Sequence, residues 1–440
     1  MKKLHIILLF ILLSGCNISN KITYDKNKVE TYVGTYLEYF INDEYDKLYH
    51  GFNHDLKDNL SLDNFMHNID EFKNKAGTYL NMFIINRSET KNNEYLISYN
   101  LDYNLKNIKL SFKLDKDLLI SDINYEYTNE FEIKLDNNHE IIKIDYLKDY
   151  PLNALLTTPN KDYKVPCIIL IQGIGQSDLD MTVGLNKPFK DLSEGLKEMG
   201  IATIRYDKRY YVYPELVNDK ITVEDEILND INYLIDRCQN HPLIDKDNIY
   251  ILGHSLGASL IPYILNQRND IKGAIMMAGS MRNIADLIYD QNMHLYNELI
   301  KELDEESIKQ VDEQLASFNE ELNKIKLLDE NSDMDEKILG ASARYWYSIN
   351  QKLNQDYLYN IDDKLFIIQG ESDFQVFKDI DYKLYYDLLK DKDNVSFKLY
   401  PGLNHLMMPS FNKNDNSEYN IPNKLSDEVI NDIGYFILDK

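Results

Sequence analysis

From about residue 130 to the end of the chain, short apolar stretches alternate with amphipathic ones, and this alternation restricts the fold more than any other feature. Residues 167–171 (Cys-Ile-Ile-Leu-Ile) are apolar without a break, which is typical of a strand buried on both faces. The alternation predicts a mostly parallel sheet with helices on both faces. We expect eight strands, at residues 140–146, 152–158, 166–172, 202–206, 249–253, 273–277, 365–369 and 396–400. The principal helices are expected at residues 188–199, 223–240, 256–266, 379–390 and 426–438.

One pentapeptide in this region has the pattern of a nucleophile turn. Gly253-His254-Ser255-Leu256-Gly257 follows an apolar strand and precedes a helix, which is the context that gives a G-x-S-x-G motif its meaning. The turn exposes the serine Oγ, and the glycines avoid clashes where strand and helix close around it. We therefore expect Ser255 to be a nucleophile and the N–H of Leu256 to be one donor of an oxyanion hole.

A base and an acid should follow this serine along the chain, the acid first. Of the nine histidines only His405 lies beyond the last expected strand, in the loop directly after it. The strand at 365–369 leads into Gly370-Glu371-Ser372-Asp373, and we expect Asp373 to be the acid, with Glu371 as the fallback. The carboxylate would hold the tautomer of His405 and stabilise its imidazolium form.

The loop at residues 173–176 (Gly-Ile-Gly-Gln) follows the strand at 166–172 and suits a second oxyanion donor. We expect the donor to be the N–H of Ile174, because glycines let the backbone approach a substrate closely. The phosphate-binding patterns G-x-x-x-x-G-K-[ST] and G-x-G-x-x-G are absent, and so is any Cys–His metal spacing. The expectation is a site without cofactor or metal.

Several segments beyond the motif resemble one group of proteins: residues 173–180, 184–192, 205–209, 345–346, 370–376 and 400–405. They are similar to bacterial α/β hydrolases of the esterase or serine-aminopeptidase-like kind. The resemblance implies the α/β-hydrolase fold over residues 130–440 and the Ser255–Asp373–His405 triad. It also implies that residues 186–189 and 207–209 shape the floor or hinge of the site. The sequence departs from the group at Gln172, where histidine is common, and at Ala258, where glycine is common.

The N-terminus has the pattern of a targeting segment. Residues 1–16 combine two lysines with a short apolar run that ends in Leu13-Ser14-Gly15-Cys16, which resembles the lipobox of bacterial lipoproteins. The resemblance implies cleavage before Cys16 and its lipidation, with residues 17–27 as a tether. The protein is then expected outside the cytoplasm, anchored by lipid to the bacterial cell membrane.

Two further units complete the predicted organisation. Residues 28–127 contain amphipathic helices followed by alternating segments, an α+β pattern that resembles a small nuclear-transport-factor-like domain. Residues 280–360 interrupt the strand–helix alternation, and their acidic, amphipathic stretch at 297–337 predicts a helical cap. The aromatic run Tyr345-Trp346-Tyr347 suits either a substrate pocket or the core of that cap.

Composition narrows the function classes. The 73 acidic residues exceed the 48 basic ones, and the net charge of −25 argues against a nucleic-acid partner. Cys167 and Cys238 are expected to be buried thiols without a disulfide. The leading hypothesis is hydrolysis of a small-molecule carboxylic ester through an acyl-enzyme. The alternatives are a serine aminopeptidase or amidase acting on a peptide, a thioesterase, or a non-catalytic extracytoplasmic binding lipoprotein.

Overall fold

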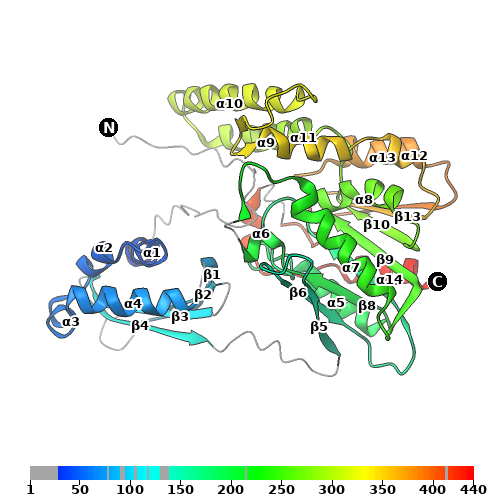
Figure 1. Ribbon diagram of the computed structural model, residues 1–440. Coiled ribbons are helices and arrows are strands. Elements are labelled where there is room, and N and C mark those ends of the chain that lie inside the picture. Colours follow the sequence, from blue (N-terminus) through cyan, green and yellow to red (C-terminus); the bar gives the residue numbers. More distant parts are fainter. Residues whose placement is uncertain are drawn as a thin grey trace. The chain divides into compact units, whose positions relative to one another are not determined.

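The strand–helix alternation forms one eight-stranded sheet in the C-terminal part of the chain (Figure 1). The computed structural model describes residues 28–76, 79–89, 95–103, 107–115, 118–128, 138–213, 216–411 and 415–440. The strands are β5 (His139–Ile144), β6 (Leu152–Thr157), β7 (Val165–Ile171), β8 (Ala202–Tyr206), β9 (Ile244–His254), β10 (Gly273–Met277), β13 (Lys364–Gly370) and β14 (Val395–Tyr400). Their order is β14-β13-β10-β9-β7-β8-β6-β5. Strand β6 runs in the direction opposite to the other seven strands of this sheet, which are mutually parallel, so the predicted fold class is confirmed.

Alternate side chains of the central strands supply two separate cores. On β7, Ile168 and Leu170 belong to one core, and Cys167, Ile169 and Ile171 to the other. Helices α5 (Pro188–Glu198) and α14 (Asp427–Leu438) cover the first face. The second face is covered by α7 (Asn229–Gln239), α8 (Leu256–Gln267) and α13 (Lys383–Leu389). Apolar runs without interruption are therefore what a sheet with helices on both faces requires.

Short elements extend several of these helices. One π-helical turn, η2 (Glu224–Leu228), precedes α7, and another, η4 (Lys378–Tyr382), precedes α13. The expected helices at 223–240 and 379–390 are therefore each built from two pieces. The remaining short helices of this part are α6 (Arg209–Val212), α12 (Asp356–Tyr359) and η5 (Asn416–Asn420).

The insertion between β10 and β13 is largely helical, as the amphipathic pattern indicates. It contains α9 (Ile284–Leu299), η3 (Ile300–Glu302), α10 (Glu305–Lys326), β11 (Lys337–Ile338), β12 (Ala341–Ser342) and α11 (Ala343–Lys352). The helical stretch breaks at Leu303, where Asp304 starts α10 by accepting a hydrogen bond from the Ser307 amide. Helices α9, α10 and α11 lie together at one side of this part (Figure 1).

Residues 28–128 form a separate unit. Its helices are α1 (Lys28–Ile41), α2 (Tyr45–His50), α3 (His54–Asn59) and α4 (Leu62–Ala76). An antiparallel meander follows, with strands β1 (Tyr79–Glu89), β2 (Tyr95–Tyr103), β3 (Asn107–Leu114) and β4 (Ile120–Thr128). Phe40 and Phe65 of the helices share a core with Leu110 and Phe112 of β3, which gives the α+β layers expected for this region.

The predicted signal peptide, its Cys16 and the tether at 17–27 lie outside the described residues. Across the described ranges, no helix is both long enough and apolar enough to cross a bilayer.

Candidate active site

Ser255 lies at the sharp turn between β9 and α8, as the motif predicts. Its backbone is in a strained conformation with a positive φ, at φ 55° and ψ −119°. The Ser255 amide donates to the carbonyl oxygen of Met277 on the neighbouring strand at 3.0 Å. The Ser255 carbonyl in turn accepts from the Ser259 amide and from Ser259 Oγ, both at 3.0 Å. Hydrogen bonds on both sides of Ser255 thus stabilise its strained backbone conformation.

The two glycines of the pentapeptide are required by packing. A Cβ on Gly253 would lie 2.3 Å from the carbonyl carbon and oxygen of Gly257. A Cβ on Gly257 would lie 2.5 Å from the Ile171 carbonyl oxygen at the end of β7. Because the clashing atoms are backbone, no side-chain movement relieves them, and the steric reason given for the motif holds.

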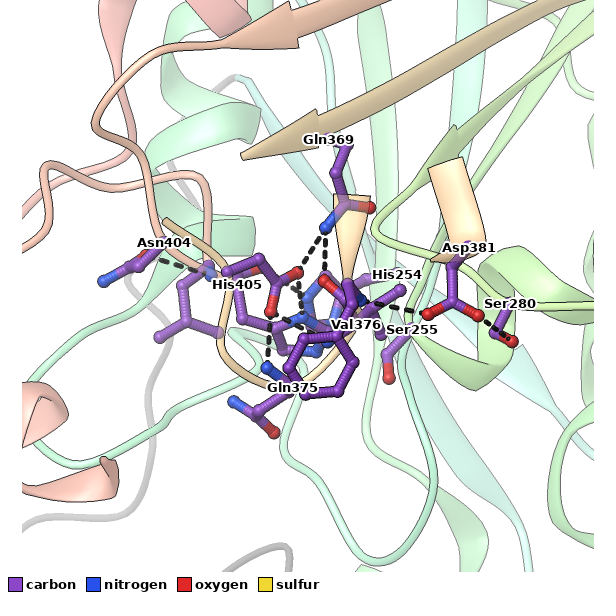
Figure 2. A network of polar contacts seen from close by, with 12 residues as sticks. His254, Ser255, Ser280, Gln369, Gln375, Val376, Asp381, Asn404 and His405 are labelled. Carbon is purple, nitrogen blue, oxygen red and sulfur yellow. Dashed lines mark hydrogen bonds and ion pairs between the residues drawn. The ribbon is translucent and has the colours of Figure 1, made fainter. Parts of the chain in front are cut away.

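The expected acid and base are in direct contact. His405 Nδ1 lies 2.8 Å from Asp373 Oδ2, and both side chains are buried. Asp373 follows β13 and His405 follows β14, so the carboxyl ends of two paired parallel strands deliver them to one place. The ring of His405 also lies 4.5 Å from the ring of His254, the residue directly before Ser255. Figure 2 shows His405 beside His254 and Ser255 at the turn.

The hydrogen bonds around Asp373 indicate which ring nitrogen of His405 donates. Asp373 Oδ1 accepts from the amides of Gln375 at 2.8 Å and Val376 at 2.9 Å, and Oδ2 accepts from Gln369 Nε2 at 2.6 Å. Carboxylate oxygens accept hydrogen bonds, so His405 Nδ1 is the donor in the fourth contact. The lone pair of the neutral imidazole is therefore on Nε2, the nitrogen that a general base uses.

Glu371, the fallback acid, points elsewhere. Its carboxylate lies 3.7 Å from Lys378 Nζ and is about one-third exposed. The structure thus brings Asp373, and not Glu371, to His405.

The loop at residues 173–176, here called the oxyanion loop, lies against Ser255. A Cβ on Gly173 would lie 3.1 Å from Ser255 Cβ and 3.6 Å from its Oγ. Leu256 is the first residue of α8, so its N–H is at the positive end of that helix. In the described part of the chain, neither the Leu256 amide nor the Ile174 amide donates to another protein group. Both are available to a substrate oxyanion.

Sequence reasoning missed the side chains that hold these loops. Gln369 is the polar residue that ends an apolar strand, and its amide group binds the Asp373 carboxylate. Glu226 lies among the buried residues of η2, and Lys208 Nζ contacts its Oε1 at 2.6 Å. A polar residue at an apolar position was the available signal in both cases. The resemblance singled out residues 207–209, and Lys208 does contact the oxyanion loop.

The predicted aromatic run belongs mainly to the core of the insertion. Tyr345 and Trp346 are buried, and Trp346 Nε1 donates to the Ile338 carbonyl at 2.8 Å. Packing is therefore favoured over a substrate pocket for these two residues. At the departure Gln172, the side-chain amide donates to the Tyr206 carbonyl and joins the ends of β7 and β8.

Two other features bear on chemistry. Within the described ranges, no group of three or more His, Cys, Asp or Glu side chains is arranged to hold a metal ion. Cys167 and Cys238 are free and buried, and burial raises the pKa of the Cys167 thiol well above its usual range.

Comparison with known proteins gives one family match, an esterase with a similar sequence and several similar solved structures. Residues 187–410 match the sequence profile of the family described as serine aminopeptidase, S33. Esterase EstD of Thermotoga maritima is 29% identical over 294 residues, which cover 66% of this chain and 67% of that protein. The solved structure of Est1E from Butyrivibrio proteoclasticus has a TM-score of 0.43 at 18% identity and covers 69% of this chain and 100% of its own. The esterase Pf2001 of Pyrococcus furiosus has a TM-score of 0.42 at 15% identity, covering 68% and 90%.

Proposed function

Because this chain belongs to the serine aminopeptidase S33 family of hydrolases, we propose that it cleaves carboxylic esters with Ser255 as nucleophile, His405 as base and Asp373 as orienting acid. The observation that carries the proposal is the 2.8 Å contact between His405 Nδ1 and Asp373 Oδ2 beside the strained turn at Ser255. An esterase relative at 29% identity supports an ester rather than another acyl substrate.

The first half of the reaction forms an acyl-enzyme. Ser255 Oγ bonds to the acyl carbon while His405 Nε2 takes the hydroxyl proton, and Asp373 stabilises the imidazolium. The negative charge on the former carbonyl oxygen is bound by the N–H groups of Leu256 and Ile174. When the tetrahedral intermediate collapses, the C–O bond to the alcohol breaks and His405 gives its proton to the leaving oxygen.

Water completes the cycle. His405 takes a proton from the water as its oxygen bonds to the acyl carbon, and the second tetrahedral intermediate releases the carboxylic acid. The proton returns to Ser255 Oγ. No step needs a metal or an organic cofactor, because the positioned groups supply the acid, the base and the charge stabilisation.

The alternatives differ in substrate class. A serine aminopeptidase or amidase of this fold is favoured by the description of the matched family. It would need a site for the substrate ammonium, for which the acidic residues of the insertion are the candidates. The family and the esterase relative favour an enzyme over a non-catalytic binding lipoprotein.

Covalent labelling tests the nucleophile. A fluorophosphonate probe should react with the full wild-type chain and not with Ser255→Ala. Ser193→Ala is a matched control, because Ser193 is buried on α5 and its hydroxyl pairs with that of Thr203, on the face of the sheet covered by α5 and α14. Labelling of Ser255→Ala, or no labelling of the wild type, would refute the serine-hydrolase mechanism.

A substrate series separates the two enzyme classes. We expect turnover of nitrophenyl esters of graded acyl length to exceed turnover of aminoacyl nitroanilides, with Ser255→Ala inactive on both. A preference for the nitroanilides would transfer the proposal to the aminopeptidase.

The location outside the cytoplasm is likewise a proposal, carried by the Leu13-Ser14-Gly15-Cys16 sequence. Expressed with its own N-terminus in a bacterium, the protein should partition into the detergent phase and incorporate labelled fatty acid, and Cys16→Ser should do neither. A Cys16→Ser variant that keeps the label would contradict the lipid anchor.

A further inference from the structure

A buried ion pair between Lys208 and Glu226 is hydrogen-bonded to the backbone of the oxyanion loop. Lys208 Nζ donates to the carbonyl oxygens of Gly173 and Gly175, the latter at 2.8 Å. It also contacts Glu226 Oε1 at 2.6 Å, and the same carboxylate oxygen accepts from the Gly175 amide at 2.8 Å. Both charged side chains are almost fully buried, at 0% and 3% exposure. The contacts therefore lie on both sides of Ile174.

The geometry of the peptide bond relates the contact at the Gly173 carbonyl to the direction of the Ile174 N–H. The carbonyl of Gly173 and the N–H of Ile174 belong to one planar peptide unit, in which the two groups point in opposite directions. An ammonium that holds the carbonyl on one side thereby orients the N–H on the other. Hydrogen bonding to the carbonyl also polarises the unit, which makes its N–H a stronger donor.

A helix of the insertion reaches the same carboxylate. The hydroxyl of Tyr345, on α11, donates to Glu226 Oε2. Burial raises the pKa of Tyr345 well above its usual range, so the phenol keeps the proton that it donates. A second contact joins the same two elements, because the Val223 amide before η2 donates to Ser348 Oγ of α11 at 2.9 Å. Helix α11 is thus linked to the oxyanion loop through one shared residue, Glu226.

A purely stabilising role explains this arrangement poorly. Burying an ion pair costs roughly several kcal/mol per ion in lost hydration. Apolar side chains of similar size in its place often stabilise a protein at least as well as the ion pair does. What apolar side chains lack is directed hydrogen bonding to three backbone groups of one loop.

We propose that Lys208 and Glu226 are positioning residues that orient the Ile174 N–H towards the substrate oxyanion. The hydrogen bond from Tyr345 to Glu226 links this orientation to helix α11. The inference rests on the proposed function, in which Ile174 is an oxyanion donor. It assigns a catalytic consequence to side chains that touch neither substrate nor triad.

Two substitutions test the proposal. Glu226→Gln keeps an acceptor for the Gly175 amide but removes the charge that holds Lys208. Tyr345→Phe removes one oxygen and leaves the ion pair in place. The chain offers a matched control, because the carboxylate of Asp432 on α14 accepts from Lys398 and from the buried Tyr400 hydroxyl at 2.7 Å. The same donor types are present there, so Asp432→Asn and Tyr400→Phe repeat the chemistry away from the oxyanion loop.

The readouts are kcat and KM on a nitrophenyl ester and the melting temperature, all on the full chain. Loss of a whole oxyanion donor costs about 10²- to 10³-fold in kcat, so misaiming one should cost Glu226→Gln about 10- to 100-fold, with KM within about twofold. Tyr345→Phe should lose about 3- to 10-fold in kcat, because only the link to α11 is cut. The two controls lie at a more exposed ion pair and should lower the melting temperature by less, while kcat stays within about twofold of wild type.

The outcomes are distinct. Values of kcat for Glu226→Gln and Tyr345→Phe that match those of their controls would overturn the positioning role, and so would a change confined to KM. If Glu226→Gln does not fold, Tyr345→Phe decides alone, since it removes a single oxygen. A Ser255→Ala enzyme with wild-type turnover would overturn the proposed function and this inference with it. A Ser255-dependent enzyme indifferent to Tyr345 and Glu226 would refute only the inference.

Discussion

His254 donates a hydrogen bond from its Nε2 to the backbone carbonyl oxygen of His405 at 2.9 Å. A carbonyl oxygen can only accept, so the proton of the neutral His254 ring is on Nε2. The contact joins the residue before the nucleophile to the backbone of the base, across 151 positions of sequence. The strand-to-helix turn and the loop that carries His405 are therefore joined by a side chain outside the proposed triad (Figure 2).

The first prediction concerns acid stability. Burial, and secondly the nearby His405, lower the pKa of His254 to about 3. An unfolded histidine has a pKa of about 6.5, so below that pH the unfolded chain binds a proton that the folded chain does not. This contribution to the free energy of unfolding is present above about pH 6.5 and is lost as pH falls towards 3. His254→Asn should abolish that loss, which amounts to about 2 kcal/mol between pH 7 and pH 5.

Urea denaturation of wild type and His254→Asn at pH 7, 6 and 5 measures the difference. His54→Asn serves as control, because His54 is exposed on α3. Wild-type and His254→Asn curves that shift in parallel with pH would contradict the prediction.

A second prediction has the opposite sign. Burial, and secondly Asp178, raise the pKa of Asp207 to about 7, against about 3.9 in an unfolded chain. Between these values the folded state keeps a proton that the unfolded state releases. The contribution to the free energy of unfolding is therefore full below about pH 4 and is lost as pH rises through 7. Between pH 5 and pH 8, the free energy of unfolding should fall by about 2 to 3 kcal/mol less in Asp207→Asn than in wild type.

Asparagine suits this test because its carbonyl oxygen can keep the hydrogen bond that Asp207 Oδ1 accepts from the Leu179 amide. The exposed Asp149 provides the control Asp149→Asn. If the denaturation midpoints of wild type and Asp207→Asn change equally with pH, protonation of Asp207 does not contribute to the pH dependence of stability.

The sequence predicted the limits of some strands of the sheet better than those of others. Strands β8 and β10 begin and end at the predicted residues, and all five residues of each strand are buried. Strand β9 begins at Ile244, five positions before its predicted start. There Ile244 pairs with Val165, although the residues that follow it are polar. Backbone pairing extends strands where side-chain patterns give no signal.

The three residues of the proposed triad could be named from the sequence, because each follows its own strand and the order along the chain is fixed. The supporting contacts could not. Glu226 meets Gly175 across 51 positions and Tyr345 across 119, and such contacts arise only when the chain folds. Local pattern placed Glu226 on a helix but gave no partner for its charge.

The third prediction tests the steric reason for the nucleophile turn. Gly257→Ala should prevent folding of the C-terminal part or destabilise it by about 3 kcal/mol or more, because its Cβ would meet two backbone carbonyls. Gly34→Ala is the matched control, since a Cβ there meets nothing within 4 Å and α1 should gain about 1 kcal/mol. Soluble yield, circular dichroism and fluorophosphonate labelling give the readout. A stable, fully labelled Gly257→Ala protein would contradict it.

The last prediction distinguishes the two candidate acids. In Asp373→Asn the oxygen can keep the Gln375 and Val376 amides, which turns the new NH₂ group towards His405 Nδ1. A donor at that position favours the tautomer with the proton on Nε2, which cannot accept the Ser255 proton. We expect kcat to fall by about 10³- to 10⁴-fold with little change in KM. Glu371→Gln, two residues earlier and facing Lys378, should keep kcat within about twofold. Steady-state kinetics on one nitrophenyl ester compares the two, and a larger loss in Glu371→Gln would transfer the acid role to Glu371.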